Sequence, residues 1–72
     1  MKSAEETFKT FGSRLREIRL SMGISQEELS GRAELDRTYV SGCERDRRNP
    51  SLKTIIKLAN ALEVNIKDFF DA

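Results

Sequence analysis

The segment LDRTYVSGCERDRRNPS, residues 35–51, concentrates positive charge in a chain whose formal net charge is only +1. Guanidinium groups bind phosphates and guanine edges through bidentate, charge-assisted hydrogen bonds. Residues 63–72 carry more acidic than basic side chains, so the two parts of the chain differ in sign. This uneven distribution predicts a surface that binds a polyanion. The basic side chains concerned are Arg37, Arg45, Arg47, Arg48 and Lys53.

The composition argues against catalysis and against metal binding. The chain contains no histidine and one cysteine, and it has neither a nucleophile elbow nor a glycine-rich phosphate loop. With 72 residues and 38% hydrophobic residues, the core is too small to enclose a substrate or to leave room for a sensory domain. We therefore expect no catalytic residue, no metal, no cofactor and no small-molecule ligand. Cys43 is expected in the core, as a small hydrophobic residue.

The apolar periodicity predicts an all-α fold, a compact domain of five helices over residues 1–72 with residues 1–5 disordered. Ser25, Asp36, Ser51 and Asn65 are predicted N-caps, and Gly23 a left-handed cap. In the fourth helix the inward side chains are predicted to be Leu52, Ile55, Ile56, Ala59 and Leu62. The expected helices cover about residues 5–22, 26–33, 36–45, 51–62 and 65–70.

The helix expected at residues 36–45 has an unusual outer face. A helical wheel with Val40 and Cys43 inward points Thr38, Ser41, Gly42 and Arg45 outward. Two of these residues are small, and a glycine in a helix costs about 1 kcal/mol relative to alanine. We interpret the face as shaped for close approach to a ligand. With the short helix before it, it makes a helix-turn-helix unit that can place its second helix in the DNA major groove.

The chain resembles the XRE family, the Cro and phage-repressor type of helix-turn-helix proteins. The resemblance covers residues 12–71 and rests on several motifs in order: Gly-Ile-Ser-Gln-Glu-Glu-Leu, a recognition helix ending in Glu-Arg, Arg-Asn-Pro-Ser, and Leu-Ala-Asn-Ala-Leu-Glu-Val. The shorter stretch LDRTYVSGCER is similar to the recognition helix of controller proteins of bacterial restriction–modification systems, which are small dimers that regulate transcription. The resemblance implies a sequence-specific transcription regulator located in the cytoplasm of a bacterium or of a phage host.

The expected DNA contacts fall into two sets. The first part of a recognition helix approaches base edges, and arginine to guanine is the commonest specific contact. Side chains at the helix edges and in the basic loop would bind phosphates, which position the protein. The predicted base-reading residues are Arg37, Thr38, Tyr39 and Ser41. The predicted phosphate-binding residues are Gln26, Arg45, Arg48, Asn49, Ser51 and Lys53.

The resemblance also assigns roles to individual positions. It implies that Gln26 bridges a phosphate and the recognition helix, and that Tyr39 packs on DNA or reads its shape; a core-edge role for Tyr39 stays open. It implies a structural ion pair between Arg19 and Glu44. Glu34 and Glu63 stand where the family usually has glycine, and a left-handed backbone there would cost about 1 to 2 kcal/mol each.

Phe69 and Phe70 are adjacent and cannot both enter one small core, so Phe70 is either a surface residue under the C-terminal tail or part of a subunit interface. Exposed apolar surface beside the acidic C-terminal end favours the interface, and therefore a homodimer. A two-fold dimer would present two recognition helices about 34 Å apart to a roughly palindromic site. The partners are thus double-stranded DNA and a second copy of the chain, with RNA polymerase as a further candidate and no membrane. The predicted interface residues are Asn60, Leu62, Ile66, Phe69 and Phe70.

Two alternatives stay open. Within the same class, the chain could be a phage-type repressor or an antitoxin that regulates its own synthesis. In a different class, the third helix could dock a protein partner, although its outer face is poor in the aromatic and aliphatic anchors that such interfaces use.

Overall fold

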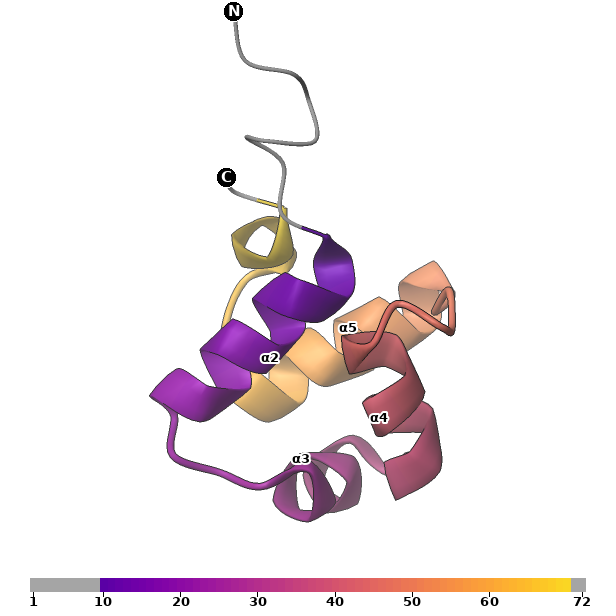
Figure 1. Cartoon of the computed structure of the whole chain (residues 1–72). Coiled ribbons are helices and arrows are strands. Elements are labelled where there is room, and N and C mark those ends of the chain that lie inside the picture. Colours follow the sequence, from indigo (N-terminus) through magenta and orange to yellow (C-terminus); the bar gives the residue numbers. More distant parts are fainter. Residues whose placement is uncertain (1–9, 71–72) are drawn as a thin grey trace, which may run out of the picture.

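The structure, a computed structural model, describes residues 10–70 and contains only helices and connecting segments over that range. Helix α4 packs against α2 and α3, α3 also packs against α5, and η1 lies on α2 and α5 (Figure 1). This arrangement confirms the predicted all-α fold class. The elements are α2 (Phe11–Ser21), α3 (Gln26–Ala33), α4 (Arg37–Glu44), α5 (Leu52–Leu62) and the 3-10 helix η1 (Ile66–Phe69).

The first and last helices differ from their predicted bounds. Thr10 has an extended backbone, and its side chain accepts a hydrogen bond from the Ser13 N–H, so α2 begins at Phe11. The prediction of one continuous helix from Glu5 is therefore wrong, because the extended backbone of the N-cap residue interrupts the helix. The rest of residues 5–9, and the disorder predicted for residues 1–5, lie outside the described residues. The last helix is a four-residue 3-10 turn rather than an α-helix.

Three predicted N-caps are confirmed. The side chains of Ser25, Asp36 and Ser51 accept hydrogen bonds from main-chain N–H groups in the first turns of α3, α4 and α5, at 3.0, 2.8 and 3.2 Å. Each bond satisfies a donor that has no partner within its own helix. The caps thus define where α3, α4 and α5 begin.

The ends of the four α-helices share one backbone device, a residue in the left-handed region. Gly23 is the only glycine among them, with φ of 72°; Glu34, Asp46 and Glu63 have φ of 57°, 60° and 57°. In each case the next N–H group bonds to a carbonyl five residues earlier, the pattern of a Schellman motif. The turn geometry of the resembled family is therefore kept at Glu34 and Glu63 without glycine.

The hydrophobic core draws on every described helix. Its members are Leu15, Ile18, Leu29, Ala33, Val40, Cys43, Leu58, Ala59, Leu62 and Phe69. Two of the predicted inward side chains of α5 are wrong: Leu52 is 66% exposed and Ile56 is 42% exposed. The inward face of α5 instead runs through Ile55, Leu58, Ala59 and Leu62, and α5 packs on α3.

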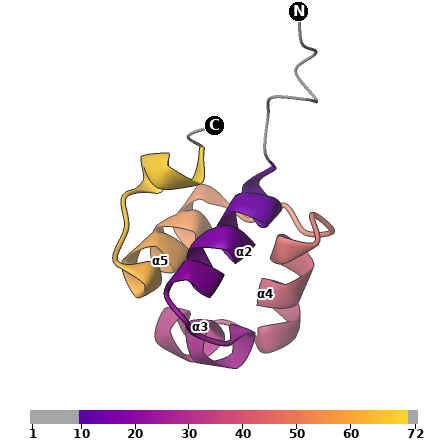
Figure 2. The same ribbon diagram turned by 60° about the vertical axis from the view of Figure 1, so that its left-hand side comes forward.

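The C-terminal 3-10 helix is attached to the start of α2 (Figure 2). The rings of Phe11 and Phe69 meet edge to face, with centroids 5.1 Å apart, and Arg14 Nε donates a 2.8 Å hydrogen bond to the Asp68 carbonyl. Phe70 stacks on Phe11 at 6.0 Å but remains 51% exposed. Phe69 therefore completes the core while its neighbour stays at the surface. Within residues 10–70, every helix is too short or too polar to cross a bilayer.

Candidate nucleic-acid interface

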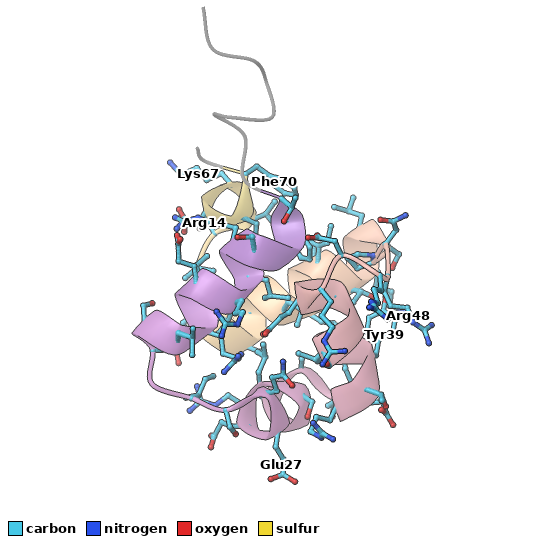
Figure 3. All side chains as sticks on the ribbon, viewed as in Figure 1. Arg14, Glu27, Tyr39, Arg48, Lys67 and Phe70 are labelled. Carbon is cyan, nitrogen blue, oxygen red and sulfur yellow. The ribbon has the colours of Figure 1, made fainter. Side chains whose placement is uncertain are left out.

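Helix α4 presents a polar outer face. Arg37, Thr38 and Arg45 are exposed along it, while Ser41 is half-buried. The aromatic ring of Tyr39 and the Arg48 side chain lie together at the outer edge of α4 (Figure 3). The structure thus gathers the four predicted base-reading residues, Arg37, Thr38, Tyr39 and Ser41, within the first five residues of the helix.

Gly42 has a different role from the one predicted. A Cβ atom at Gly42 would lie 2.7 Å from Arg48 Cγ, so the arginine side chain covers the helix at this point. Gly42 was predicted to belong to an outer face open to close approach by a ligand, and at this position Arg48 occupies that space instead. The absent side chain accommodates Arg48, which follows α4 and folds back on it.

Tyr39 occupies the core-edge position that the sequence left open for it. Its ring is half-buried and packs against the core, and the Arg48 guanidinium carbon lies 5.7 Å from the ring centroid. That distance is within the range of a cation–π interaction. Tyr39 therefore holds a basic side chain beside the recognition face.

Cys43 lies in the core on the inner side of α4. Burial raises the pKa of its thiol, so the thiol stays protonated and is a poor nucleophile.

A shallow groove separates the first turns of α3 and α4. Its volume is about 450 Å³, and it brings Gln26 together with Arg37. These residues were predicted to bind phosphate and to read bases, and they come from different helices. The lining residues are Arg19, Ser25, Gln26, Glu27 and Arg37. Glu27, in the first turn of α3, points away from the body of the molecule (Figure 3).

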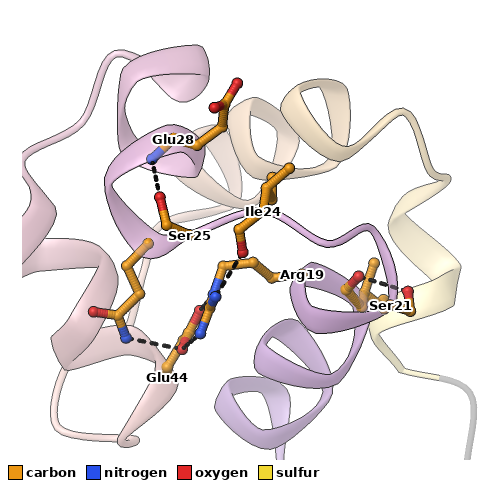
Figure 4. Close-up of polar contacts among 8 residues, drawn as sticks. Arg19, Ser21, Ile24, Ser25, Glu28 and Glu44 are labelled. Atoms are coloured by element: carbon orange, nitrogen blue, oxygen red, sulfur yellow. Dashed lines mark hydrogen bonds and ion pairs between the residues drawn. The ribbon is translucent and has the colours of Figure 1, made fainter.

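A buried polar network holds this groove in shape. Arg19 donates from Nε and Nη2 to the two Glu44 oxygens at 2.6 and 3.1 Å, and from Nη1 to the Ile24 carbonyl at 2.8 Å (Figure 4). Gln26 Nε2 donates to Glu44 Oε1 at 3.0 Å. One N–H of the Gln26 amide is therefore used internally, and the other remains for an outside acceptor. The network connects α2, the turn before α3, and the end of α4.

Asp36 organises the start of α4. The Thr38 hydroxyl donates a short hydrogen bond to Asp36 Oδ1, and the Thr38 N–H bonds to the same oxygen. The hydrogen bond from the Thr38 hydroxyl, and to a smaller extent the one from the Thr38 N–H, lower the pKa of the Asp36 carboxyl below its usual value of 3.8. Because the hydroxyl hydrogen of Thr38 is donated to Asp36, a base would meet the hydroxyl lone pairs and the methyl group of Thr38.

The predicted phosphate-binding residues beyond α4 form a continuous exposed run into α5. Arg47, which belongs to the predicted basic surface but was not assigned individually to phosphate binding, is exposed in the same loop. The Ser51 hydroxyl is used internally, since it accepts from Thr54 N–H and donates to Thr54 Oγ1 at 3.1 Å. A phosphate at this helix start would therefore meet main-chain N–H groups and the Lys53 side chain. The exposed run consists of Arg45, Arg47, Arg48, Asn49, Ser51 and Lys53.

The predicted dimer interface needs a correction. Leu62 and Phe69 are fully buried in the core of a single chain, so they have no surface to offer a partner. Asn60 and Phe70 are exposed, and Ile66 is half-buried. Phe70 lies at the end of the molecule opposite to α3 (Figure 3). Phe70 thus lies away from the groove.

One contact between the basic loop and α2 was not predicted from the sequence. It joins Asp46 to Thr10 and Gly12, which lie more than 30 residues before it in the chain. A signal was present: Gly12 lies in the first turn of a helix, where glycine is unfavourable unless another backbone approaches.

The comparisons with known proteins agree with this geometry. Residues 15–69 match the helix-turn-helix family model of XRE type. The chain is 48% identical over 62 residues to the control protein C.BamHI of Bacillus amyloliquefaciens, covering 85% of this chain and 76% of that protein. The crystal structure of the restriction–modification controller protein C.AhdI from Aeromonas hydrophila is similar, with a TM-score of 0.82, 52% identity, and coverage of 83% of this chain and 91% of that one.

A second solved structure includes DNA. The controller protein C.Esp1396I, crystallised as a tetramer with its natural 35 base-pair operator, has a TM-score of 0.77 and 39% identity, covering 82% of this chain and 78% of that one. The family comprises DNA-binding regulators of transcription rather than enzymes. This chain belongs to the XRE-type helix-turn-helix family of DNA-binding transcription regulators.

Proposed function

We propose that the protein is a homodimeric, sequence-specific transcription regulator of the restriction–modification controller type, acting in the cytoplasm on a roughly palindromic operator. The observation that carries the proposal is the groove between α3 and α4, which brings the Gln26 amide and the Arg37 guanidinium to one surface. A glutamine with one free N–H suits a phosphate, and an arginine at the first position of α4 suits a guanine edge.

The charge distribution supports the same orientation on DNA. The exposed run from Arg45 to Lys53 continues from the end of α4 into the start of α5, where free N–H groups also favour anions. Insertion of α4 into the major groove would therefore place basic groups against the flanking phosphates. If each subunit neutralises about three or four phosphates, the logarithm of affinity should fall with the logarithm of salt concentration with a slope of about −6 for the dimer.

The dimer follows from doubling of these contacts. A single recognition helix reads few base pairs, whereas two helices related by a two-fold axis read two half-sites. Exposed Phe70, with Asn60 and Ile66, supplies the proposed contact between copies. Contact with RNA polymerase belongs to the same proposal, and transcription from the selected operator with purified polymerase tests it.

Selection of bound sites from random DNA duplexes at near-physiological salt tests the function. The wild-type protein should enrich a two-fold symmetric sequence, and Arg37→Ala should lose the base preference while retaining nonspecific binding. Enrichment of no sequence by the wild-type protein, or a salt slope near zero, would contradict the proposal. If Arg37→Ala kept the base preference of the wild-type protein, only the assignment of Arg37 as a base-reading residue would be wrong.

A further inference from the structure

The basic loop after α4 begins with a backbone conformation that its residue type does not favour. Asp46 has a φ of 60°, and it lies where the Schellman motif of α4 would accept glycine without strain. The motif itself is intact, since the Asp46 and Arg47 N–H groups bond to the Cys43 and Gly42 carbonyls at 3.1 and 2.9 Å. Unlike Glu34 and Glu63, which have the same left-handed backbone, Asp46 uses its side chain for hydrogen bonds to another helix within the described part of the chain.

Its carboxylate caps the start of a different helix. Asp46 Oδ2 accepts a 2.7 Å hydrogen bond from the Thr10 hydroxyl, and Oδ1 accepts a 3.1 Å hydrogen bond from the Gly12 N–H. Both donors belong to the N-terminal end of α2, where the helix dipole also favours a negative charge. The Gly12 N–H has no acceptor within α2, so Asp46 satisfies a donor that the helix leaves open.

Gly12 allows this approach. A Cβ atom there would lie 2.2 Å from the Cys43 carbonyl oxygen and 2.6 Å from Asp46 Oδ1. The backbone of α2 thus touches the last turn of α4 directly, and the carboxylate closes the contact. The start of the basic loop is fixed to α2 on one side and to α4 on the other.

The arginines of the loop lack comparable attachments. Over residues 10–70, the side chains of Arg45 and Arg47 make no hydrogen bond or ion pair, and Arg48 is held only by Tyr39 and the bare backbone of Gly42. Their positions depend on the backbone that carries them. We propose that Asp46 is a positioning residue for DNA binding, whose bonds to Thr10 and Gly12 hold the basic loop in the conformation that meets the phosphates. This inference rests on the proposed function.

The negative charge of Asp46 and its hydrogen bonds should have opposite effects on DNA affinity. A carboxylate among DNA-facing arginines repels phosphates, so removing its charge alone should strengthen binding. Loss of positioning should weaken binding, because the loop must then be ordered at the moment of association. The two effects act in opposite directions, and variants that remove the same charge separate them.

Asp46→Asn and Asp46→Gly form the matched pair. Asparagine keeps both hydrogen bonds, because its Oδ1 accepts from the Gly12 N–H and its amide donates to the Thr10 oxygen, and it tolerates the left-handed backbone. Glycine favours the same backbone and removes both hydrogen bonds. We expect Asp46→Asn to bind operator DNA at least as tightly as the wild-type protein, and Asp46→Gly to bind roughly tenfold more weakly than Asp46→Asn.

Binding is measured by fluorescence anisotropy with the selected operator at two salt concentrations, at a temperature where circular dichroism shows each variant folded. Amide exchange of the Gly12 N–H reports the contact directly: it should be slow in the wild-type protein and in Asp46→Asn, and fast in Asp46→Gly. Equal DNA affinity of the two variants would overturn the inference, whatever their affinity relative to wild type. Absence of DNA binding by the wild-type protein would instead refute the proposed function.

A second pair tests the contact from the side of α2, and it serves should Asp46→Gly be unfolded. Thr10→Ser keeps the hydroxyl that donates to Asp46 and accepts from the Ser13 N–H, and Thr10→Val removes both hydrogen bonds at nearly constant volume. Weaker DNA binding of Thr10→Val than of Thr10→Ser, with both proteins folded, supports the inference; equal binding contradicts it.

Discussion

Arg19 and Glu44 form a buried two-point ion pair between α2 and α4, with an Nε–Oε2 distance of 2.6 Å and an Nη2–Oε1 distance of 3.1 Å. The side chains are only 8% and 2% exposed. The same carboxylate accepts from Gln26, so the pair fixes the orientation of a residue that faces the groove. The interaction therefore links the stability of the fold to the geometry of the proposed DNA-binding surface.

Removing one member of this pair should destabilise the fold strongly. Glu44→Ala leaves a buried guanidinium without its partner, and we expect a loss of about 3 to 5 kcal/mol in the free energy of unfolding, measured by urea denaturation. The double variant Arg19→Met with Glu44→Leu should lose much less, because no charge is left unpaired. A single variant as stable as the wild-type protein would show that the pair is not structurally important.

Gly12 and Gly31 provide a matched test of backbone contact. Both lie within helices, where alanine is favoured by about 1 kcal/mol. A Cβ atom at Gly31 meets nothing within 4 Å, so Gly31→Ala should raise the melting temperature. Gly12→Ala should lower the melting temperature, because its Cβ atom would overlap the Cys43 carbonyl. The expected loss in the free energy of unfolding is about 1 to 3 kcal/mol. Equal effects of the two substitutions would mean that α2 and α4 are not in direct contact.

Replacing a glutamate that has a left-handed backbone by glycine should raise the stability of the fold. Glu63→Gly relieves a residue with φ of 57°, and it should stabilise the protein by up to about 1 kcal/mol after the greater flexibility of glycine in the unfolded chain is counted. Glu63→Ala removes the same charge but keeps the Cβ atom, so it should give no such gain. Thermal unfolding of the two variants separates backbone strain from charge.

The sequence predicted the helices because local signals define them. Ser25, Asp36 and Ser51 precede apolar periodic segments, and each caps the helix expected. The resemblance also implied the pairing of Arg19 with Glu44, which joins residues that are 25 positions apart. Periodicity alone could not have identified it, because neither residue carries a local signal for the other.

Other features could not be predicted because they depend on which backbones meet. Gly42 and Gly12 are both glycines in helices, yet one lies under the side chain of Arg48 and the other against a carbonyl. Apolar periodicity placed Leu52 inward, but Leu52 lies in the first turn of α5 and is exposed there. Asp46 looked like part of a charged loop, and only the fold brings it to the start of α2.

Substitution of a base-reading residue and substitution of a phosphate-binding residue should change DNA affinity in different ways. Arg37→Ala should cost about 1 to 3 kcal/mol on the selected operator and little on unrelated DNA. Lys53→Ala should weaken binding to both DNAs similarly and make the salt slope shallower by about 1 for each phosphate that is no longer neutralised. Titrations of the two variants against operator and unrelated duplexes over a salt series measure these differences. A uniform loss in Arg37→Ala would reassign this residue to phosphate binding.

The proposed dimer surface can be tested with two apolar side chains of equal exposure. Phe70 is 51% exposed beside the start of α2, and Leu20 is 50% exposed near its other end. Aromatic side chains at the centre of an interface often contribute about 2 kcal/mol or more to association. We therefore expect Phe70→Ser to raise the dimer dissociation constant at least about tenfold in sedimentation equilibrium, whereas Leu20→Ser should leave it unchanged. Because operator binding by two half-sites requires the dimer, Phe70→Ser should also weaken DNA binding most at low protein concentration. A dimer disrupted by Leu20→Ser instead would move the interface to the C-terminal end of α2.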